Sequence, residues 1–527
     1  MDTAYKNTKK TNDTKKQKAQ KRARNKKLWR IFACIVLLAQ LVTSGVAIVQ
    51  ISLSKMLPAV YMAVVVLFYL LSFLLVTAFL LLIRKRKGQK KKAFYMKRVL
   101  GCIISAFTIF ISVFVSDVMG RLNTTINNIT VDQTVVTDMM AVYVRADDPA
   151  QQLADTSSYN YGATTSFDYK DVEDTVAHIN EELSTDIVPE EYGSAFEMVD
   201  ALLQGEIDAF VLNEAHVAII MDMEGYELFY EQTKVIYEYE IHTVVEVENN
   251  EEVEEPLDVT EDVFIMYISG SDTRNKKLST SRSDVNILAV INPKTKQVLL
   301  LNTPRDYYVP ISISSSGECD KLTHCSLYGI DCSMDTLDDL YDTGIDYYGQ
   351  INFTGFETLI DAIGGICVES EKAFTTTHGG YSIAKGTNYL NGAQALGFVR
   401  ERYAFSDGDI ARGRNQMRVI TAVISKITSG TTILTHYAEI MDSMEGMFVT
   451  DMSADEIKSL VNMQLSDMSS WDIRTYYVTG ANACKTTYSM PNDPNYVMIP
   501  DETMVQKAKD LIVKMESGQM LTDADFE

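Results

Sequence analysis

Arginine residues are concentrated in one part of this 527-residue sequence. Residues 99–527 contain 11 arginines, and eight of them lie between positions 274 and 418. The surrounding chain is strongly acidic, so solubility does not require such a cluster. A guanidinium group offers a planar fork of donors that binds phosphate or carboxylate through two hydrogen bonds. The cluster indicates a site for a polyanion such as a diphosphate, and pairing with nearby carboxylates is the alternative.

Two aspartates in this window lie beside arginines at the ends of expected strands. Asp272 follows the expected strand Phe264–Ile268, and Asp284 precedes the expected strand Asn286–Asn292. Each has an arginine two positions away. Carboxylates that meet at one edge of a sheet can hold Mg²⁺, which keeps several waters and also takes phosphate oxygens.

Three more charged motifs follow in the sequence. NTPRD (302–306) ends the expected strand Gln297–Leu301, VRER occupies 399–402, and DIARGRNQ occupies 409–416. Side chains two positions apart project together from an extended segment but diverge on a helix. We therefore expect the pairs Arg400/Arg402 and Arg412/Arg414 to lie in extended segments or loops.

Strands alternate with helices through the C-terminal half of the chain. Besides the three strands above, apolar spacing predicts helices over 356–363, 392–399 and 415–428 and a strand over 366–368. Such alternation predicts an α/β/α sandwich. A helix over 194–204, ended by Gly205 and followed by a buried strand over 207–212, predicts a second, smaller α/β module.

Three apolar runs dominate the first 120 residues. They are Ile31–Leu53, Leu57–Ile83 and Val99–Val118, each near the ~20 residues that cross a bilayer. Lysine and arginine crowd the segment before the first run and residues 84–98, whereas the loop between the first two runs carries only Lys55. The positive-inside rule then places the N-terminus in the cytoplasm and everything after about Gly120 outside the cell membrane.

The chain is too long for one compact domain. We expect a basic cytoplasmic tail (1–30), three transmembrane helices (31–120), an extracytoplasmic accessory domain (121–245), an acidic linker (246–262), a catalytic domain (263–515) and a C-terminal tail (516–527).

Charge and cysteine usage exclude some function classes. Residues 1–98 hold 22 Lys/Arg and 2 Asp/Glu, so the remainder holds 26 against 69, a net of −43. Such a surface does not bind nucleic acid through a basic field. The six histidines have no metal-ligand spacing, so a zinc site is not expected. Five cysteines follow the apolar runs, and we expect at least one disulfide involving the loop of Cys319, Cys325 and Cys332.

The ordered motifs resemble those of a known family. GSDTR, RSDV, TPRDYYV, DKLTH, NFTGF-x4-DAIGG, G-x-QAL-x-FVRER and D-x-x-R-x-RNQ, over about residues 264–420, resemble the LytR-CpsA-Psr family. Three spans and an accessory module look like its capsule-polymer members. The resemblance implies a phosphotransferase that moves a glycopolymer from a polyprenyl-pyrophosphate carrier to peptidoglycan through a phosphodiester, with Mg²⁺ or Mn²⁺ as cofactor. Other capsule-synthesis proteins would be further partners.

The resemblance also implies roles for particular residues. Asp272 and Asp284 match the metal-holding positions, and with Arg305 they form the implied catalytic set. The implied pyrophosphate-binding set is Arg282, Arg305, Arg400, Arg402, Arg412, Gln416 and Lys321. Asp306 and Asp361 match frequent family positions that we interpret as structural supports. The sequence departs from the family pattern in the cysteine-rich insert around Lys321.

Two other functions remain open at this point. The chain could be a lipid-pyrophosphate receptor or assembly factor for wall polysaccharide synthesis, or it could hydrolyse the lipid diphosphate without an acceptor. Turnover of a lipid diphosphate separates the enzymes from the receptor, and dependence of the product on peptidoglycan separates transferase from hydrolase.

The charge asymmetry of the loops yields a test of orientation. Protease added to intact protoplasts should remove residues 121–527 and spare the basic tail, which immunoblotting against each end would show. Digestion of the tail with survival of the 262–527 region would contradict the predicted orientation.

Overall fold

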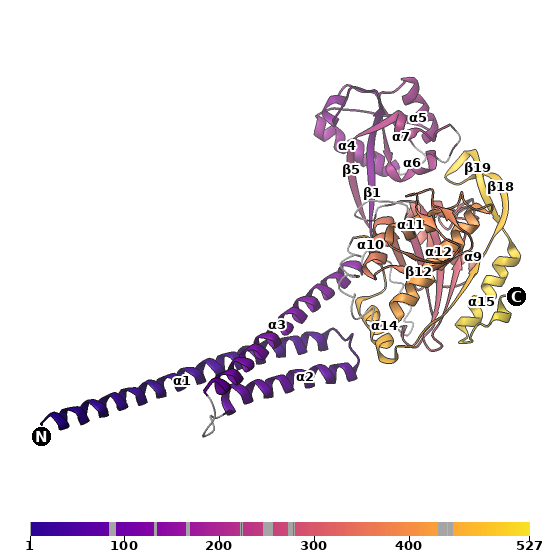
Figure 1. The fold of residues 1–527 in the computed structure, drawn as a ribbon. Coiled ribbons are helices and arrows are strands. Elements are labelled where there is room, and N and C mark those ends of the chain that lie inside the picture. Colours follow the sequence, from indigo (N-terminus) through magenta and orange to yellow (C-terminus); the bar gives the residue numbers. More distant parts are fainter. Residues whose placement is uncertain are drawn as a thin grey trace. The chain divides into compact units, whose positions relative to one another are not determined.

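A computed structural model describes residues 2–83, 91–130, 134–164, 169–221, 223, 225–245, 257–271, 278, 280–429, 440 and 446–527 (Figure 1). The chain separates into two compact units. The first is Met1–Thr124 with Lys458–Asp467, and the second is Thr125–Ile457 with Met468–Glu527.

Long apolar helices make up most of the first unit. They are α1 (Asp2–Leu53), α2 (Ala59–Thr77), extended by the π-helical turn Ala78–Leu82, and α3 (Lys91–Ile129). Three segments are long and apolar enough to cross a membrane: Lys16–Leu53, Ala59–Leu82 and Phe94–Ile129. They correspond to the three predicted apolar runs.

A polar contact network joins these helices. The amide of Gln40 is buried, donates to Ser72 Oγ at 3.2 Å and accepts from Ser105 Oγ at 2.8 Å. Ser72 also shares a hydrogen bond with Thr108 at 2.7 Å. Because a polar group in hydrocarbon must be paired, such contacts favour a fixed register between the helices.

The second unit contains a five-stranded sheet in the order β3-β2-β4-β1-β5. Its elements are β1 (Thr134–Arg145), β2 (Tyr161–Thr164), α4 (Tyr169–Leu183), β3 (Glu190–Tyr192), α5 (Ala195–Gln204), β4 (Ala209–Asn213), α6 (Glu214–Met221), α7 (Phe229–Gln232) and β5 (Thr233–Val245). Helix α5 matches the predicted helix, because Ser194 Oγ accepts from Phe196 N and Gly205 ends the helix with a φ of +78°.

A six-stranded mixed sheet follows, in the order β16-β11-β6-β7-β8-β17. Its strands are β6 (Phe264–Ser271), β7 (Ser283–Asn292), β8 (Gln297–Asn302), β11 (Tyr347–Asn352), β16 (Phe448–Thr450) and β17 (Asp472–Tyr477). Strands β6 and β8 both run antiparallel to β7, while β11 is parallel to β6 and β17 is parallel to β8. The carboxyl ends of β6, β8, β11 and β17 therefore share one sheet edge with the start of β7.

Helices cover both faces of this sheet (Figure 1). On one face, Leu288 and Leu299 pack in a cluster with residues of α9 (Ile330–Tyr341) and α15 (Glu502–Glu516). On the other face, Ala289 and Leu300 pack against Met417 of α12 (Gly408–Thr428). This arrangement confirms the predicted α/β/α sandwich.

Shorter elements complete the second unit. They are β9 (Tyr308–Pro310), β10 (Cys319–Lys321), α8 (Leu322–Cys325), α10 (Phe353–Ala362), β12 (Ile366–Ser370), β13 (Phe374–Thr375), β14 (Ser382–Ile383), β15 (Gly386–Leu390), α11 (Gly392–Arg400), β18 (Gly480–Thr487) and β19 (Met490–Pro500). Helix α14 spans Ala454–Asp467.

Candidate functional site

The candidate site lies at the sheet edge where β6 and β8 end and β7 begins. Two buried hydroxyl pairs join β6 to the start of β7, Ser269 with Ser283 at 2.9 Å and Ser271 with Ser281 at 2.6 Å. Side chains alternate along an extended chain, so Arg282 and Asp284 project together on the side away from these serines. The serine pairs thus fix the position of both charged groups.

One cleft collects seven of the residues that the sequence motifs singled out. Its lining includes Arg282, Asp284, Arg305, Arg400, Arg402, Arg412 and Gln416. Five arginines against one carboxylate give the lining a formal charge of +4 in a chain whose net charge is −23. Charge of one sign in a concave, partly desolvated site attracts a polyanion strongly.

Asp284 lies at the centre of this charge. Its carboxylate is 2.7 Å from Nη1 of Arg305 and 3.7 Å from Nη1 of Arg412. Burial alone would raise the pKa of the Asp284 carboxyl, but the charges of Arg305, Arg412 and Arg282 outweigh burial and hold the pKa well below its usual range. Asp284 therefore stays ionised throughout the physiological pH range.

Arg305 and Lys321 share a second buried carboxylate. Arg305 Nε lies 3.5 Å from Asp306 Oδ2, and Lys321 Nζ lies 3.7 Å from Asp306 Oδ1. The main chain of Asp306 is held in turn by a 2.7 Å hydrogen bond from Met498 N. These contacts agree with the interpretation of Asp306 as a support, and they place Lys321 behind Arg305 despite the cysteine-rich insert.

Helix α12 supplies Arg412 and Gln416 one turn apart on the same face. The helix lies close to the end of β8, and a Cβ on Gly413 would be 2.6 Å from Asn302 Oδ1. Any larger residue at position 413 would force the Asn302 side chain to move. The expectation that Arg412 and Arg414 lie in an extended segment was wrong. Because both are on α12, they diverge, and Arg414 pairs with Asp407 and Glu371 instead of entering the cleft.

Aromatic rings hold the other two arginines of the cleft. Arg400, the last residue of α11, lies over the ring of Phe353 at 4.5 Å from its centroid. Arg402 lies 4.9 Å from the ring centroid of Tyr403 and donates to its hydroxyl at 2.8 Å. A cation over a ring face is orientated without being neutralised. The two rings therefore help to set the direction of both guanidinium groups.

Other expectations need correction or lie outside the described residues. Asp272, the partner expected for Asp284, is outside them. Arg418 follows the last motif residue, Gln416, by two positions, which favours the outer face of a helix, but it is only part-exposed and pairs with Glu371 at 2.5 Å. A histidine outside the charged motifs is more often a surface or turn residue, but His324 is buried and hydrogen-bonds to Asp320 at 2.8 Å. Asp361 is confirmed in a supporting position, because its carboxylate accepts from Gly392 N at the start of α11.

The sequence motifs did not assign three residues that line the cleft, namely Phe353, His378 and Tyr403. Phe353 follows the end of β11 at the shared sheet edge, so its position after a strand was a usable signal. Tyr403 is adjacent to the VRER motif. His378 is an exposed turn residue, as expected, but nothing in its local sequence indicated that the turn borders the cleft.

The donor chemistry of the cleft fits a hard divalent cation in one respect. An ionised carboxylate, Asp284, faces a space suited to phosphate oxygens, and Mg²⁺ is often held by only one or two carboxylates plus substrate phosphates. Within the part of the chain that the structure describes, no group of three or more His, Cys, Asp or Glu side chains could hold a metal ion. A purely protein-made metal cage is therefore not formed by these residues.

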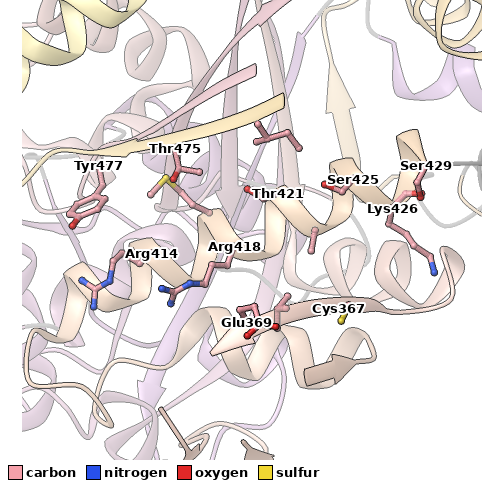
Figure 2. A pocket seen from close by; sticks show the side chains of 14 residues that line it. Cys367, Glu369, Arg414, Arg418, Thr421, Ser425, Lys426, Ser429, Thr475 and Tyr477 are labelled. Carbon is pink, nitrogen blue, oxygen red and sulfur yellow. The ribbon is translucent and has the colours of Figure 1, made fainter. Parts of the chain in front are cut away.

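A larger groove of about 800 Å³ lies along helix α12. Figure 2 shows it between α12, β12 and β17, with Arg414 and Arg418 toward one end and Lys426 and Ser429 toward the other. Its apolar lining comes from Val368, Met417, Ala422 and Ile473. Tyr477 lines both this groove and the narrow space beside Asp284, Arg305 and Arg412. Tyr477 therefore separates the groove from that narrow space.

The second unit contains a three-layered α/β domain in which five arginines line one cleft at a sheet edge. The chain belongs to the LytR_cpsA_psr family, whose match covers residues 230–510, more than half of the sequence.

Curated relatives carry the same domain. A polyisoprenyl-teichoic acid–peptidoglycan teichoic acid transferase, TagU of Enterococcus faecalis (strain ATCC 700802 / V583), is 34% identical over 199 residues, which are 37% of this chain and 64% of that protein. The transferase of the same description named TagT, from Bacillus subtilis (strain 168), is 33% identical over 241 residues, 42% of this chain and 73% of that protein. This chain thus spans slightly less than two thirds of the TagU sequence.

The crystal structure of B. subtilis TagV aligns with 50% of this chain and 99% of its own chain, at 24% identity and a TM-score of 0.42.

The contact between Phe353 and Arg400 yields a test of the cleft. Phe353→Leu should weaken the binding of methylenediphosphonate roughly three- to tenfold, because a desolvated cation–π contact contributes about 1 kcal/mol to holding the arginine. Titration calorimetry on the full chain would measure the affinity. Trp471→Leu removes a similar contact with Lys296, 5.1 Å from the ring, outside the cleft and should leave the affinity unchanged. Equal losses in both variants would contradict the assignment of this cleft.

Proposed function

We propose that this protein transfers a glycopolymer from a polyprenyl-pyrophosphate carrier to peptidoglycan, forming a phosphodiester on the outer side of the membrane. One observation carries the proposal, namely the convergence of five arginines with a single ionised carboxylate in one cleft. The curated relatives that share this domain are described as polyisoprenyl-teichoic acid–peptidoglycan teichoic acid transferases. The proposal applies the same reaction class to this chain without specifying the polymer.

The arrangement suits phosphoryl transfer because this reaction needs positioning and charge neutralisation more than covalent help. Arg305 and Arg412, both largely buried, would bind the diphosphate from the floor of the cleft. Arg400 and Arg402, orientated by aromatic rings, would bind it from the side formed by α11. Donors fixed in this way stabilise charge that develops on the leaving phosphate without reorganising.

Asp284 and Asp272 are the residues that we propose for holding Mg²⁺ or Mn²⁺. The cation would supply further neutralisation of the diphosphate charge. Asp284 is suited to this role because it remains anionic among arginines and faces the cleft.

The neighbouring groove suits the lipid part of the donor. Its apolar residues come from α12, β12 and β17, and it shares Tyr477 with the narrow space beside Arg305 and Arg412. A polyprenyl chain in the groove would leave its diphosphate at the arginines, because the headgroup and the chain are covalently continuous. Burial of the prenyl chain would contribute binding energy that holds the reacting phosphate in place.

The proposed location follows from the helices of the first unit. Three segments are suited to anchor the chain in the membrane, and loop charge favours a cytoplasmic N-terminus. The domain limits inferred from the sequence, and partnership with other capsule-synthesis proteins, belong to the same proposal.

Loss of one cleft arginine should remove turnover without unfolding the protein. Arg305→Ala should lower turnover of a lipid-diphosphate donor about a hundredfold, since a buried charge-assisted contact to the transition state contributes about 3 kcal/mol. Lysine should restore little, because an ammonium cannot reproduce the planar fork. The assay follows transfer of labelled polymer to peptidoglycan.

Arg474→Ala is the matched control for this experiment. Arg474 lies on the same sheet but near the start of β17, where it pairs with Asp472 at 3.0 Å. It should keep near-normal turnover. Equal losses of turnover in both variants would show that the reaction takes place outside this cleft. Release of free polymer at an unchanged rate in the absence of peptidoglycan would favour a hydrolase.

The metal proposal has a separate test. Asp284→Ala should raise the Mg²⁺ concentration needed for half-maximal turnover about tenfold or more, because it removes a direct ligand. Asp407→Ala is the control, since Asp407 is also paired with an arginine but lies outside the cleft. An Asp284→Ala variant with an unchanged Mg²⁺ requirement would remove this residue from the metal site.

A further inference from the structure

Two buried thiols face each other beneath the segment that carries Lys321. Cys325 ends α8 and Cys332 lies in the first turn of α9, and their side chains are within hydrogen-bond distance of each other. They are 0% and 3% exposed and belong to one apolar cluster. Their shared hydrogen bond raises the pKa of the Cys325 thiol and lowers that of Cys332. The structure has all seven cysteines as free thiols, including the loop for which the sequence predicted a disulfide.

The turn that ends at Cys325 is tied to the cleft. Cys325 Sγ lies 3.9 Å from the carbonyl oxygen of Lys321, and Lys321 Nζ lies 3.7 Å from Asp306, which also contacts Arg305. A shift of this turn would therefore move a cation that lies directly behind the proposed pyrophosphate site.

Polar contacts hold the other side of the same turn. Asp320 pairs with His324 at 2.8 Å and accepts from Ser489 N at 2.8 Å, with all three residues buried. Burial opposes ionisation, but His324 and Ser489 outweigh it and hold the pKa of Asp320 below its usual range. The Asp320 side of this turn is therefore held by strong hydrogen bonds. The side of the two thiols is held more weakly, because a thiol is a poor hydrogen-bond donor and a poor acceptor.

We propose that Cys325 and Cys332 form a disulfide bond that fixes this turn, and Lys321 with it, beside the cleft. The inference rests on the proposed function in one respect, the oxidising compartment outside the membrane. In forming the S–S bond, each thiol gives up one proton and one electron. Both pairs go to the disulfide of a thiol–disulfide oxidoreductase, which leaves as a dithiol. Since both sulfurs are covered in the folded protein, the exchange precedes the completion of folding.

Peptide mapping tests the bond directly. The full chain is extracted from membranes with an alkylating agent present throughout, denatured and digested by chymotrypsin, which cleaves after Tyr328 between the two cysteines. The expected product is a linked pair of peptides that separates on reduction. Cys367 and Cys484, both exposed, should carry the alkyl label and serve as internal controls. Alkylated Cys325 and Cys332 would overturn the proposal.

A second measurement tests the effect of the bond on the turn. Reductant should lower the thermal midpoint of the wild-type domain by roughly 5–10 °C, the size expected for a short closed loop in a domain of this length. It should also weaken methylenediphosphonate binding roughly threefold or more, through displacement of Lys321. The variant Cys325→Ser/Cys332→Ser should show neither response, whereas Cys367→Ser/Cys484→Ser should behave as wild type. A linked peptide pair without either response in the wild type would disprove the positioning role.

These measurements do not use polymer transfer. A bond found in a chain that fails to turn over the lipid donor would contradict the proposed function alone. Free thiols in a chain that turns the donor over would contradict the disulfide alone.

Discussion

The candidate site of the second unit depends on holding several positively charged arginines close together at one sheet edge. Five guanidinium groups line the cleft there with one carboxylate, Asp284, while Arg305 also contacts Asp306 and Arg412 also pairs with Asp409 at 2.6 Å. The fold must still resist the repulsion among the five positive charges. The resistance comes from rigid surroundings, namely serine pairs at the start of β7, the close approach of α12 to β8, and aromatic rings under Arg400 and Arg402. In the proposed function, a bound polyanion would relieve the repulsion among the arginines. The rigid surroundings would already hold the arginines in position for it.

Strand ends explain why much of the site could be predicted from the sequence. Charged motifs directly after or before β-prone segments must lie at a sheet edge, and mixed strand directions bring β6, β7 and β8 to the same edge. The order of motifs then connected Arg282, Asp284 and Arg305 with Arg400, Arg402 and Arg412 over a long sequence distance. The alternation of apolar segments was sufficient for the α/β/α sandwich, because each buried strand requires a helix on each face.

The sequence-based expectations that were wrong have a common physical cause. Whether DIARGRNQ forms a helix depends on its docking against β8 through Gly413, a contact between distant segments that local spacing does not contain. The burial of His324 likewise depends on Ser489, which is 165 positions away in the chain. His378 reaches the cleft through a turn whose path is set by tertiary packing. In each case the local pattern was compatible with two outcomes and the rest of the fold decided between them.

Helix α12 contributes residues to both the charged cleft and the groove, from different faces of the helix. Arg412 and Gln416 face the charged cleft, whereas Met417, Thr421 and Ser425 line the groove. The position of a residue around the helix axis decides which cavity it lines, since each residue turns the helix by about 100°. Insertion or deletion of a single residue after Gly413 would rotate every later side chain of the helix, withdrawing Gln416 from the cleft and Met417 from the groove. Among changes of comparable size, evolution should therefore accept substitutions in this helix far more readily than changes in its length.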